Sequence, residues 1–309
     1  MERKFKQSAC ITPKFIIYVF TFALTYILFF FLGGTFAQEG STLNVPIEVL
    51  EALRLKGTGI NRTQEPLTVG VPLPEDLGIK SINQLGLSGV RAAQFRPLAY
   101  HKNGNIKWVL IDTQVDMPAN GKNSSIALVD GRGNFGGQNL AAEDQDYIYV
   151  NTGPAQFTIR KRGFNLFNKV TLEGQQIINK GDSLGILITG MDGKVYKASN
   201  DEHANVTIEE NGPVKTVIKA QGANYSSDGK RMTDFTVRMY FYKEKGKVRV
   251  SYTLRNASKD QIETANIKSL DLVSKISLGH NLKVRAATHN SFIEDVLLPD
   301  NSVIFYQAH

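Results

Sequence analysis

The amino-acid sequence predicts an all-β protein that follows a hydrophobic N-terminal segment. Apolar and polar residues alternate with a period of two from Phe235 to Tyr242, which is typical of a strand with one buried face. The pair Asn103-Gly104 separates two apolar runs and supplies the positive φ angles that a tight hairpin turn needs. With 42% hydrophobic and 21% charged residues, the 309-residue chain has the composition of a folded globular protein.

The first element is an uncharged apolar run at residues 15–32, preceded by a basic N-terminus. The small residues Thr35 and Ala37 suit a signal peptidase, so we expect residues 1–37 to be a signal peptide that is cleaved before Gln38. The alternative is a retained anchor helix, because about eighteen apolar residues are just enough to span a bilayer. Under both interpretations the remainder is exported, and is secreted, periplasmic or held at the cell surface. The single cysteine precedes the run, so the exported part forms no disulfide.

A hairpin is the clearest element of the following region. A strand at residues 94–100 turns at Asn103-Gly104 and returns over residues 106–115. Both faces of the return strand carry apolar residues, which predicts a central strand buried on both sides, with Trp108 in the core.

Residues 38–150 are expected to form the first β domain. A further strand at 124–129 precedes a Gly-rich and then polar stretch at 131–146, which predicts a long loop and places the domain boundary near residue 150. Residues 45–55 are the only plausible helix, although they lack a convincing N-cap.

Residues 151–309 are expected to form an antiparallel β-sandwich, complete or cut short at the end of the chain. Its core hairpin consists of strands at 235–242 and 248–254, where apolar side chains occupy every second position. The antiparallel connections and the absence of helical periodicity indicate stacked sheets. Further strands are expected at residues 267–278, 282–286 and 303–307.

Four sequence segments resemble a known family. The runs EPLTVGVPLPEDLGI, AAQFRPLAYHKNGNIKWVLIDTQVDMPANG and GFNLFNKVTLEG are similar to the N-terminal RIFT-type β-barrel of the exo-acting rhamnogalacturonan lyases. The later run FTVRMYFYKEKGKVRVSYTLRN is similar to the central β-sandwich of the same family. Together these segments lie within residues 60–280, and their order matches the family's order of domains.

The resemblance implies a protein that acts on pectin. Members of this family are secreted and cleave the pectin backbone by β-elimination, in a cleft that belongs to a C-terminal α/α toroid. Nothing in this sequence has the helical periodicity of that toroid, so the resemblance implies a non-catalytic N-terminal portion whose partners are an acidic polysaccharide and a missing α/α domain. The alternative is a stand-alone glycan-binding, structural or adhesion protein of the cell surface.

The polar side of the strand over 235–242 is the predicted carbohydrate-binding surface, formed by Arg238, Tyr240 and Tyr242. Aromatic faces stack on sugar rings, and guanidinium groups bind carboxylates in a bidentate manner, so this combination suits an acidic sugar. The alternative interpretation is that the tyrosines cover the join to a neighbouring domain. The next strand and the turn before it add the basic residues Lys247, Arg249 and Arg255.

Other site chemistries find less support in the sequence. The net charge of +7 lies partly in the leader and forms no basic run, so we expect no nucleic-acid partner. The five histidines show no metal-ligand spacing, and no serine or cysteine nucleophile motif is present, so no cofactor is expected. The carboxylates of Glu143, Asp144 and Asp146 could contribute to a calcium site. The alternative is that they are solvated charges of a loop.

Overall fold

The computed structural model describes residues 43–51, 59–256, 265–277, 285–287 and 292–294. Within these ranges the chain forms β-strands, turns and three short 3₁₀ helices, which confirms the predicted all-β class. The elements are β1 (Asn44–Leu50), β2 (Arg62–Pro72), η1 (Glu75–Leu77), η2 (Ile82–Gln84), β3 (Leu85–Ser88), β4 (Ala93–Tyr100), β5 (Ile106–Met117), β6 (Lys122–Asp130), β7 (Ala141–Glu143), β8 (Tyr147–Asn151), β9 (Ala155–Arg160), β10 (Lys169–Leu172), β11 (Gln175–Ile178), β12 (Ser183–Gly190), β13 (Val195–Lys197), η3 (Ala198–Asn200), β14 (Asn205–Asn211), β15 (Lys215–Tyr225), β16 (Arg231–Tyr242), β17 (Val248–Arg255), β18 (Ile267–Ser274), β19 (Arg285–Ala287) and β20 (Phe292–Glu294).

Strands β1 to β6 form two three-stranded antiparallel sheets around one apolar core. One sheet has the order β2-β5-β4 and the other the order β1-β6-β3. The predicted hairpin is present as β4 and β5, and β5 is the central strand, as its two apolar faces predict. Val109 and Ile111 on one face of β5 are fully buried, whereas Trp108 on the other face is half-buried against Gly70 of β2.

Two local expectations for this region were wrong. The segment expected as a helix at residues 45–55 begins as strand β1, because Val45, Ile47 and Val49 alternate with exposed residues and pack on the core with a period of two. The long loop expected at 131–146 contains the short strand β7, which pairs with β8.

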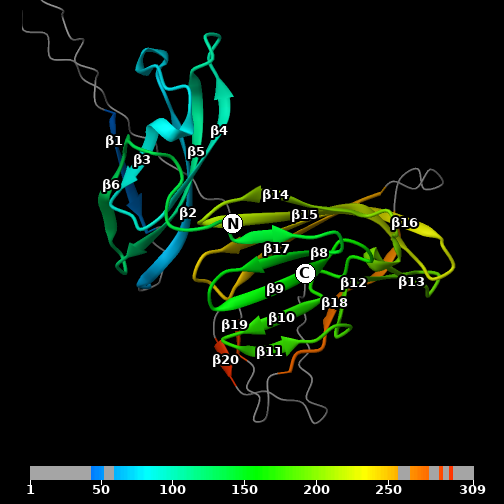
Figure 1. Ribbon diagram of the computed structural model, residues 1–309. Coiled ribbons are helices and arrows are strands. Elements are labelled where there is room, and N and C mark those ends of the chain that lie inside the picture. Colours follow the sequence, from blue (N-terminus) through cyan, green and yellow to red (C-terminus); the bar gives the residue numbers. More distant parts are fainter. Residues whose placement is uncertain (1–42, 52–58, 257–264, 278–284, 288–291, 295–309) are drawn as a thin grey trace, which may run out of the picture. The chain divides into compact units, whose positions relative to one another are not determined.

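Strands β7 to β18 form a β-sandwich of two antiparallel sheets. The five-stranded sheet has the order β11-β10-β9-β8-β7, and β8, β9 and β10 lie side by side in Figure 1. The larger sheet has the order β17-β16-β15-β13-β12-β18, with β14 paired to β15. Side chains of both sheets meet in one core, where Phe157 packs on Phe241 and Phe164 stacks on Phe235.

The alternation predicted for β16 is confirmed, whereas β17 follows it only in part, because Val250 on its inward side is exposed. Phe235, Val237, Met239 and Phe241 are buried, whereas the residues between them are half-buried on the opposite face. The register pairs Phe235 with Leu254 and Phe241 with Val248, so the two strands form the expected antiparallel hairpin. The face of the hairpin that points away from the core is therefore available for a site.

Some expectations fall on residues that the structure does not describe. The signal or anchor segment at 1–37 and the strand at 303–307 lie outside the described residues. Among the residues that are described, no helix has the length and apolar character needed to cross a bilayer. The five-stranded sheet begins at Ala141, and the domain boundary near residue 150 stays a prediction.

Candidate functional site

The candidate site lies on the outer face of the β15, β16 and β17 strands. The register places Tyr240 of β16 between Val217 of β15 and Arg249 of β17, and it pairs Arg238 with Lys219 and Ser251. Because successive side chains of a strand alternate between faces, Arg238, Tyr240 and Tyr242 share this face. The structure therefore brings the three predicted residues onto one surface, but it gives each a different set of contacts.

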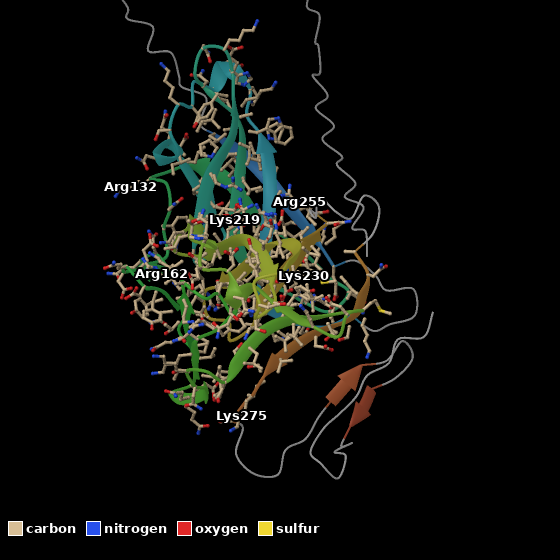
Figure 2. All side chains as sticks on the ribbon, turned by 90° about the vertical axis from the view of Figure 1, so that its right-hand side faces the viewer. Arg132, Arg162, Lys219, Lys230, Arg255 and Lys275 are labelled. Carbon is tan, nitrogen blue, oxygen red and sulfur yellow. The ribbon has the colours of Figure 1, made fainter. Side chains whose placement is uncertain are left out.

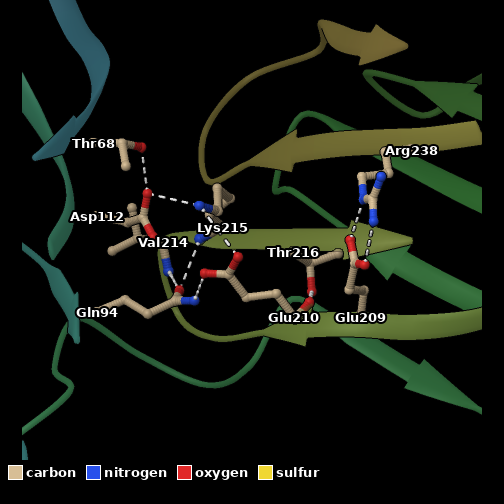
Figure 3. A network of polar contacts seen from close by, with 9 residues as sticks. All are labelled: Thr68, Gln94, Asp112, Glu209, Glu210, Val214, Lys215, Thr216 and Arg238. Atoms are coloured by element: carbon tan, nitrogen blue, oxygen red, sulfur yellow. Dashed lines mark hydrogen bonds and ion pairs between the residues drawn. The ribbon is translucent and has the colours of Figure 1, made fainter. Parts of the chain in front are cut away.

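Arg238 is engaged by an internal carboxylate. Its Nε and Nη2 atoms donate hydrogen bonds to Glu209 Oε2 and Oε1 at 2.6 and 2.8 Å, in the side-on bidentate arrangement shown in Figure 3. Lys219 Nζ approaches the same carboxylate at 3.6 Å. The hydrogen bonds from Arg238 lower the pKa of Glu209, so this carboxylate is ionised at neutral pH.

Tyr240, which is half-buried, and Arg249, which is exposed, form an aromatic and cationic pair. The guanidinium carbon of Arg249 lies 5.3 Å from the centroid of the Tyr240 ring, within the range of a cation–π contact. In the part of the chain that the structure describes, neither Arg249 nor Lys247 has an ion pair with a carboxylate. The guanidinium of Arg249 is therefore available to an external anion.

Arg255 differs from Arg249, although both belong to β17 and to the same face. Its Nη2 atom donates to Asp234 Oδ2 at 2.6 Å, and Arg231 also binds this carboxylate. The cations Arg132, Arg162 and Lys275, labelled in Figure 2, belong to loops and lie apart from Lys219 in that view. Arg249 and Lys247, the cations of the candidate site without a carboxylate partner among the described residues, belong to the β16–β17 hairpin.

Tyr242 lies at the edge of this face, next to a buried ionic network. Burial raises the pKa of Tyr242. The positive charge of Lys215 lowers this pKa, and the negative charge of Asp112 raises it. Lys215, which pairs with Tyr242 across β15 and β16, is itself buried. The surroundings of Tyr242 fit the alternative interpretation, in which a tyrosine covers a join, better than they fit an open sugar platform.

The buried network joins β5 of the N-terminal sheets to β14 and β15 of the sandwich. Lys215 Nζ donates to Asp112 Oδ1 at 2.7 Å and lies 3.3 Å from Glu210 Oε2. Thr68 donates its hydroxyl to Asp112, as Figure 3 shows. Gln94 donates to Glu210 at 2.9 Å and accepts the backbone N–H of Lys215 at 3.1 Å.

The charges of this network are not balanced one to one. Two carboxylates, Asp112 and Glu210, share the single cation Lys215, and Asp112 Oδ2 is buried without a hydrogen-bond partner. Burial raises the pKa of Glu210, and the charge of Asp112 raises it further, while Lys215 acts in the opposite direction. The network therefore depends on its lysine for stability.

The sequence did not predict the contributions of Glu209 and Glu210. The register of β14 against β15 shifts between Ile208 and Glu210, which is a β-bulge. This bulge lets adjacent glutamates contact two different cations, Glu209 with Arg238 and Glu210 with Lys215. A polar residue such as Asp112 within the apolar strand β5 is the one sequence signal that indicates the buried network.

The acidic loop considered for calcium has protein partners instead. Asp144 accepts the backbone N–H groups of Asp146 and Tyr147 and the hydroxyl of Tyr149, and Glu143 pairs with Lys161 at 2.8 Å. Among the described residues, no three histidine, cysteine, aspartate or glutamate side chains gather in a way that holds a metal ion.

A cavity of about 490 Å³ lies near the turn after β16, and it is a weaker candidate. Its lining includes Gln114, Lys243 and Glu244 together with Arg91 and Asp116. The Arg91 and Asp116 side chains approach to 4.0 Å, and Lys243 donates to the backbone carbonyl of Gly136. The cavity is thus lined by charges of both signs, and Arg91 and Lys243 already have partners. It therefore offers an acidic ligand fewer available cations than the surface at Arg249 does.

Comparison with known families places the sandwich in one of them. Residues 140–296, just over half of the chain, match the family described as the PcRGLX-like protein central beta sandwich domain. This match confirms the family resemblance for the rhamnogalacturonan lyase-like sandwich, while the RIFT-type assignment of the N-terminal sheets stays a prediction. The run GFNLFNKVTLEG, at residues 163–174, lies within the match and includes strand β10 of the sandwich, so its assignment to the RIFT-type barrel was wrong. No curated protein matches the chain.

Proposed function

The chain belongs to the PcRGLX-like family, and on this premise we propose that it is the exported, glycan-holding part of a rhamnogalacturonan lyase-like architecture. It binds an acidic pectic chain on the outer face of the β16–β17 hairpin and does not cleave it. The observation that supports this proposal is the pair of half-buried Tyr240 and exposed Arg249, a ring with an adjacent cation that has no carboxylate partner among the described residues.

The proposed contacts follow from the chemistry of an acidic sugar. The apolar C–H face of a sugar ring stacks on Tyr240, and the carboxylate of a galacturonate unit accepts two hydrogen bonds from the guanidinium of Arg249. Lys247, which directly precedes β17, adds a second positive charge near Arg249 in the sequence. The site therefore selects an acidic chain over a neutral one by charge-assisted hydrogen bonds.

The carboxylates of this face do not favour a lyase reaction. β-Elimination requires a base that removes the proton beside the uronate carboxylate and a cation that stabilises the resulting enolate. On the described face, Glu209 is held by Arg238, and Asp234 is held by Arg231 and Arg255. Incubation of the full chain with rhamnogalacturonan, followed by ultraviolet absorbance, tests this point, since turnover to an unsaturated product would contradict a purely binding role.

Isothermal titration with rhamnogalacturonan oligosaccharides tests the binding site. Loss of a charged hydrogen-bond partner costs about 2 kcal/mol, so we expect Arg249→Gln to bind about thirtyfold more weakly. Arg255→Gln is the matched control, because it removes the same group from the same face of the same strand, but at a position where Asp234 already binds it. Equal affinities of the two variants, or no heat with the wild-type protein, would refute the proposed site.

Export is the part of the proposal that depends on residues 1–37. A basic N-terminus followed by an apolar run and small residues supports it. Mass spectrometry of the mature protein from its own host distinguishes the two forms. A chain that starts at Gln38 indicates a cleaved signal peptide, whereas an intact N-terminus in the membrane fraction indicates an anchor.

A further inference from the structure

We infer that Glu209 occupies the place of a ligand carboxylate on Arg238. As an internal competitor, it lowers the affinity of the glycan site for an acidic ligand. This inference rests on the proposed function. It adds Arg238 to the binding surface as a second guanidinium, one that becomes available only when Glu209 is displaced. The ligand class is an oligosaccharide with a carboxylate on neighbouring or alternate sugar units.

The geometry of the Glu209 contact is that of a bound acid. Both carboxylate oxygens accept hydrogen bonds from Arg238, from Nε and from Nη2, which is the fork arrangement that guanidinium groups form with free carboxylate ligands. Lys219 provides a second cation at 3.6 Å. A uronate carboxylate in place of Glu209 meets the same two positive groups.

The position of Arg238 fits a site that continues from Tyr240. The two residues are separated by one residue on β16 and share a face, so their Cα atoms lie about 7 Å apart along the strand. Arg249 pairs with Tyr240 across β16 and β17, and its guanidinium lies over the tyrosine ring. A sugar ring on Tyr240 is therefore flanked by one cation that is free of carboxylates and one that Glu209 covers.

The β-bulge of β14 explains how Glu209 reaches this face. The register slips between Ile208 and Glu210, so Glu209 has no paired residue on β15. The carboxylate of Glu209 and the guanidinium of Arg238 remain about one-third exposed, with side-chain exposures of 34% and 37%. An ion pair at this exposure is weak, so a ligand carboxylate can exchange with Glu209 at small cost.

The test compares two glutamate-to-glutamine variants of the full chain by isothermal titration with a rhamnogalacturonan oligosaccharide. Glu209→Gln removes the internal competitor, and we expect about fivefold tighter binding. Glu48→Gln is the matched control, because Glu48 also pairs with a cation, Lys122 at 3.1 Å, and both variants raise the net charge by one. The same oligosaccharide with its carboxyl groups reduced to alcohols is the neutral probe.

Several outcomes support the inference. They are a gain in affinity for Glu209→Gln but not for Glu48→Gln, the loss of this gain with the reduced oligosaccharide, and its loss in the double variant Glu209→Gln/Arg238→Gln. Glu209→Ala, a second variant without the carboxylate, is expected to shift the affinity in the same direction.

Other outcomes overturn the inference or the proposed function separately. If the wild-type protein binds and Glu209→Gln is no tighter than Glu48→Gln, the inference fails while the proposed function stands. A gain that persists with the reduced oligosaccharide also overturns the inference, since it shows that no carboxylate is exchanged. If neither the wild-type protein nor any variant binds, the proposed function fails and the inference fails with it.

Discussion

Replacement of Lys215 by methionine tests the buried network most severely. The side chains of Asp112, Lys215 and Glu210 have exposures of only 2%, 7% and 12%, so the lysine is the buried cation for two buried carboxylates. Removal of one partner of a buried ion pair destabilises a protein by about 3–5 kcal/mol, because the remaining charge stays in a medium that solvates it poorly. We expect a loss of this size for Lys215→Met at neutral pH.

The control is Lys219→Met, on the same strand and the same face. Lys219 is 25% exposed and lies 3.6 Å from Glu209, so its ion pair is accessible to water and contributes about 0–1 kcal/mol. Urea unfolding of the full chain, followed by the fluorescence of Trp108, reports on the strand that carries Asp112, because Trp108 is the single tryptophan. Far-ultraviolet circular dichroism follows both sets of sheets.

The loss for Lys215→Met is expected to depend on pH. Burial raises the pKa of Glu210 in the folded protein above its ordinary value of 4.5, and removal of the lysine charge raises it further. A raised folded-state pKa contributes stability below 4.5 that is lost as the pH rises through the folded-state value. The deficit of the variant should therefore grow as the pH rises above about 4.5. A loss under about 1 kcal/mol at neutral pH, equal to that of Lys219→Met, would refute the role given to Lys215.

Two further predictions concern other parts of the fold. Gly212→Ala should destabilise the protein by about 1–3 kcal/mol, because the added Cβ would lie 2.1 Å from the buried amide of Gln94. Gly70→Ala is the control in the same urea assay, since its added Cβ would lie 3.8 Å from Trp108, an ordinary contact distance. Burial raises the pKa of Tyr252 from 10.0 to about 12, so the unfolding midpoint of the wild-type protein should fall as the pH rises from about 10 to about 12. Tyr252→Phe should lack that part of the pH dependence, and equal pH profiles of the two proteins would contradict it.

The sequence predicted those elements whose pattern is local. β16 alternates between buried and half-buried side chains from Phe235 to Tyr242, β17 shows the same period apart from Val250, and β4 and β5 are joined by an Asn-Gly turn, so each hairpin is encoded within a short stretch. β1 was missed because its seven residues include only three alternating apolar positions, and they acquire a burial direction only when β6 pairs with them.

The candidate site was predicted in its residue types but not in its contacts. Tyr240 and Arg238 were found because they share the polar side of one strand. Whether a cation is free or paired depends on residues that are distant in the sequence, such as Glu209 for Arg238. This pairing depends on a register shift in β14, and a one-residue shift has no signature in an isolated sequence.

Hydroxyl-radical footprinting in the presence of a rhamnogalacturonan oligosaccharide tests most directly whether the outer face of the β16–β17 hairpin holds an acidic glycan. Tyr240 is the ring on which a sugar is proposed to stack, while Tyr100 and Tyr149 are exposed tyrosines on other strands and serve as internal references. We expect the oligosaccharide to lower the oxidation of Tyr240 and to leave that of Tyr100 and Tyr149 unchanged. Unchanged oxidation of Tyr240 at a saturating concentration, or equal protection of all three rings, would contradict it.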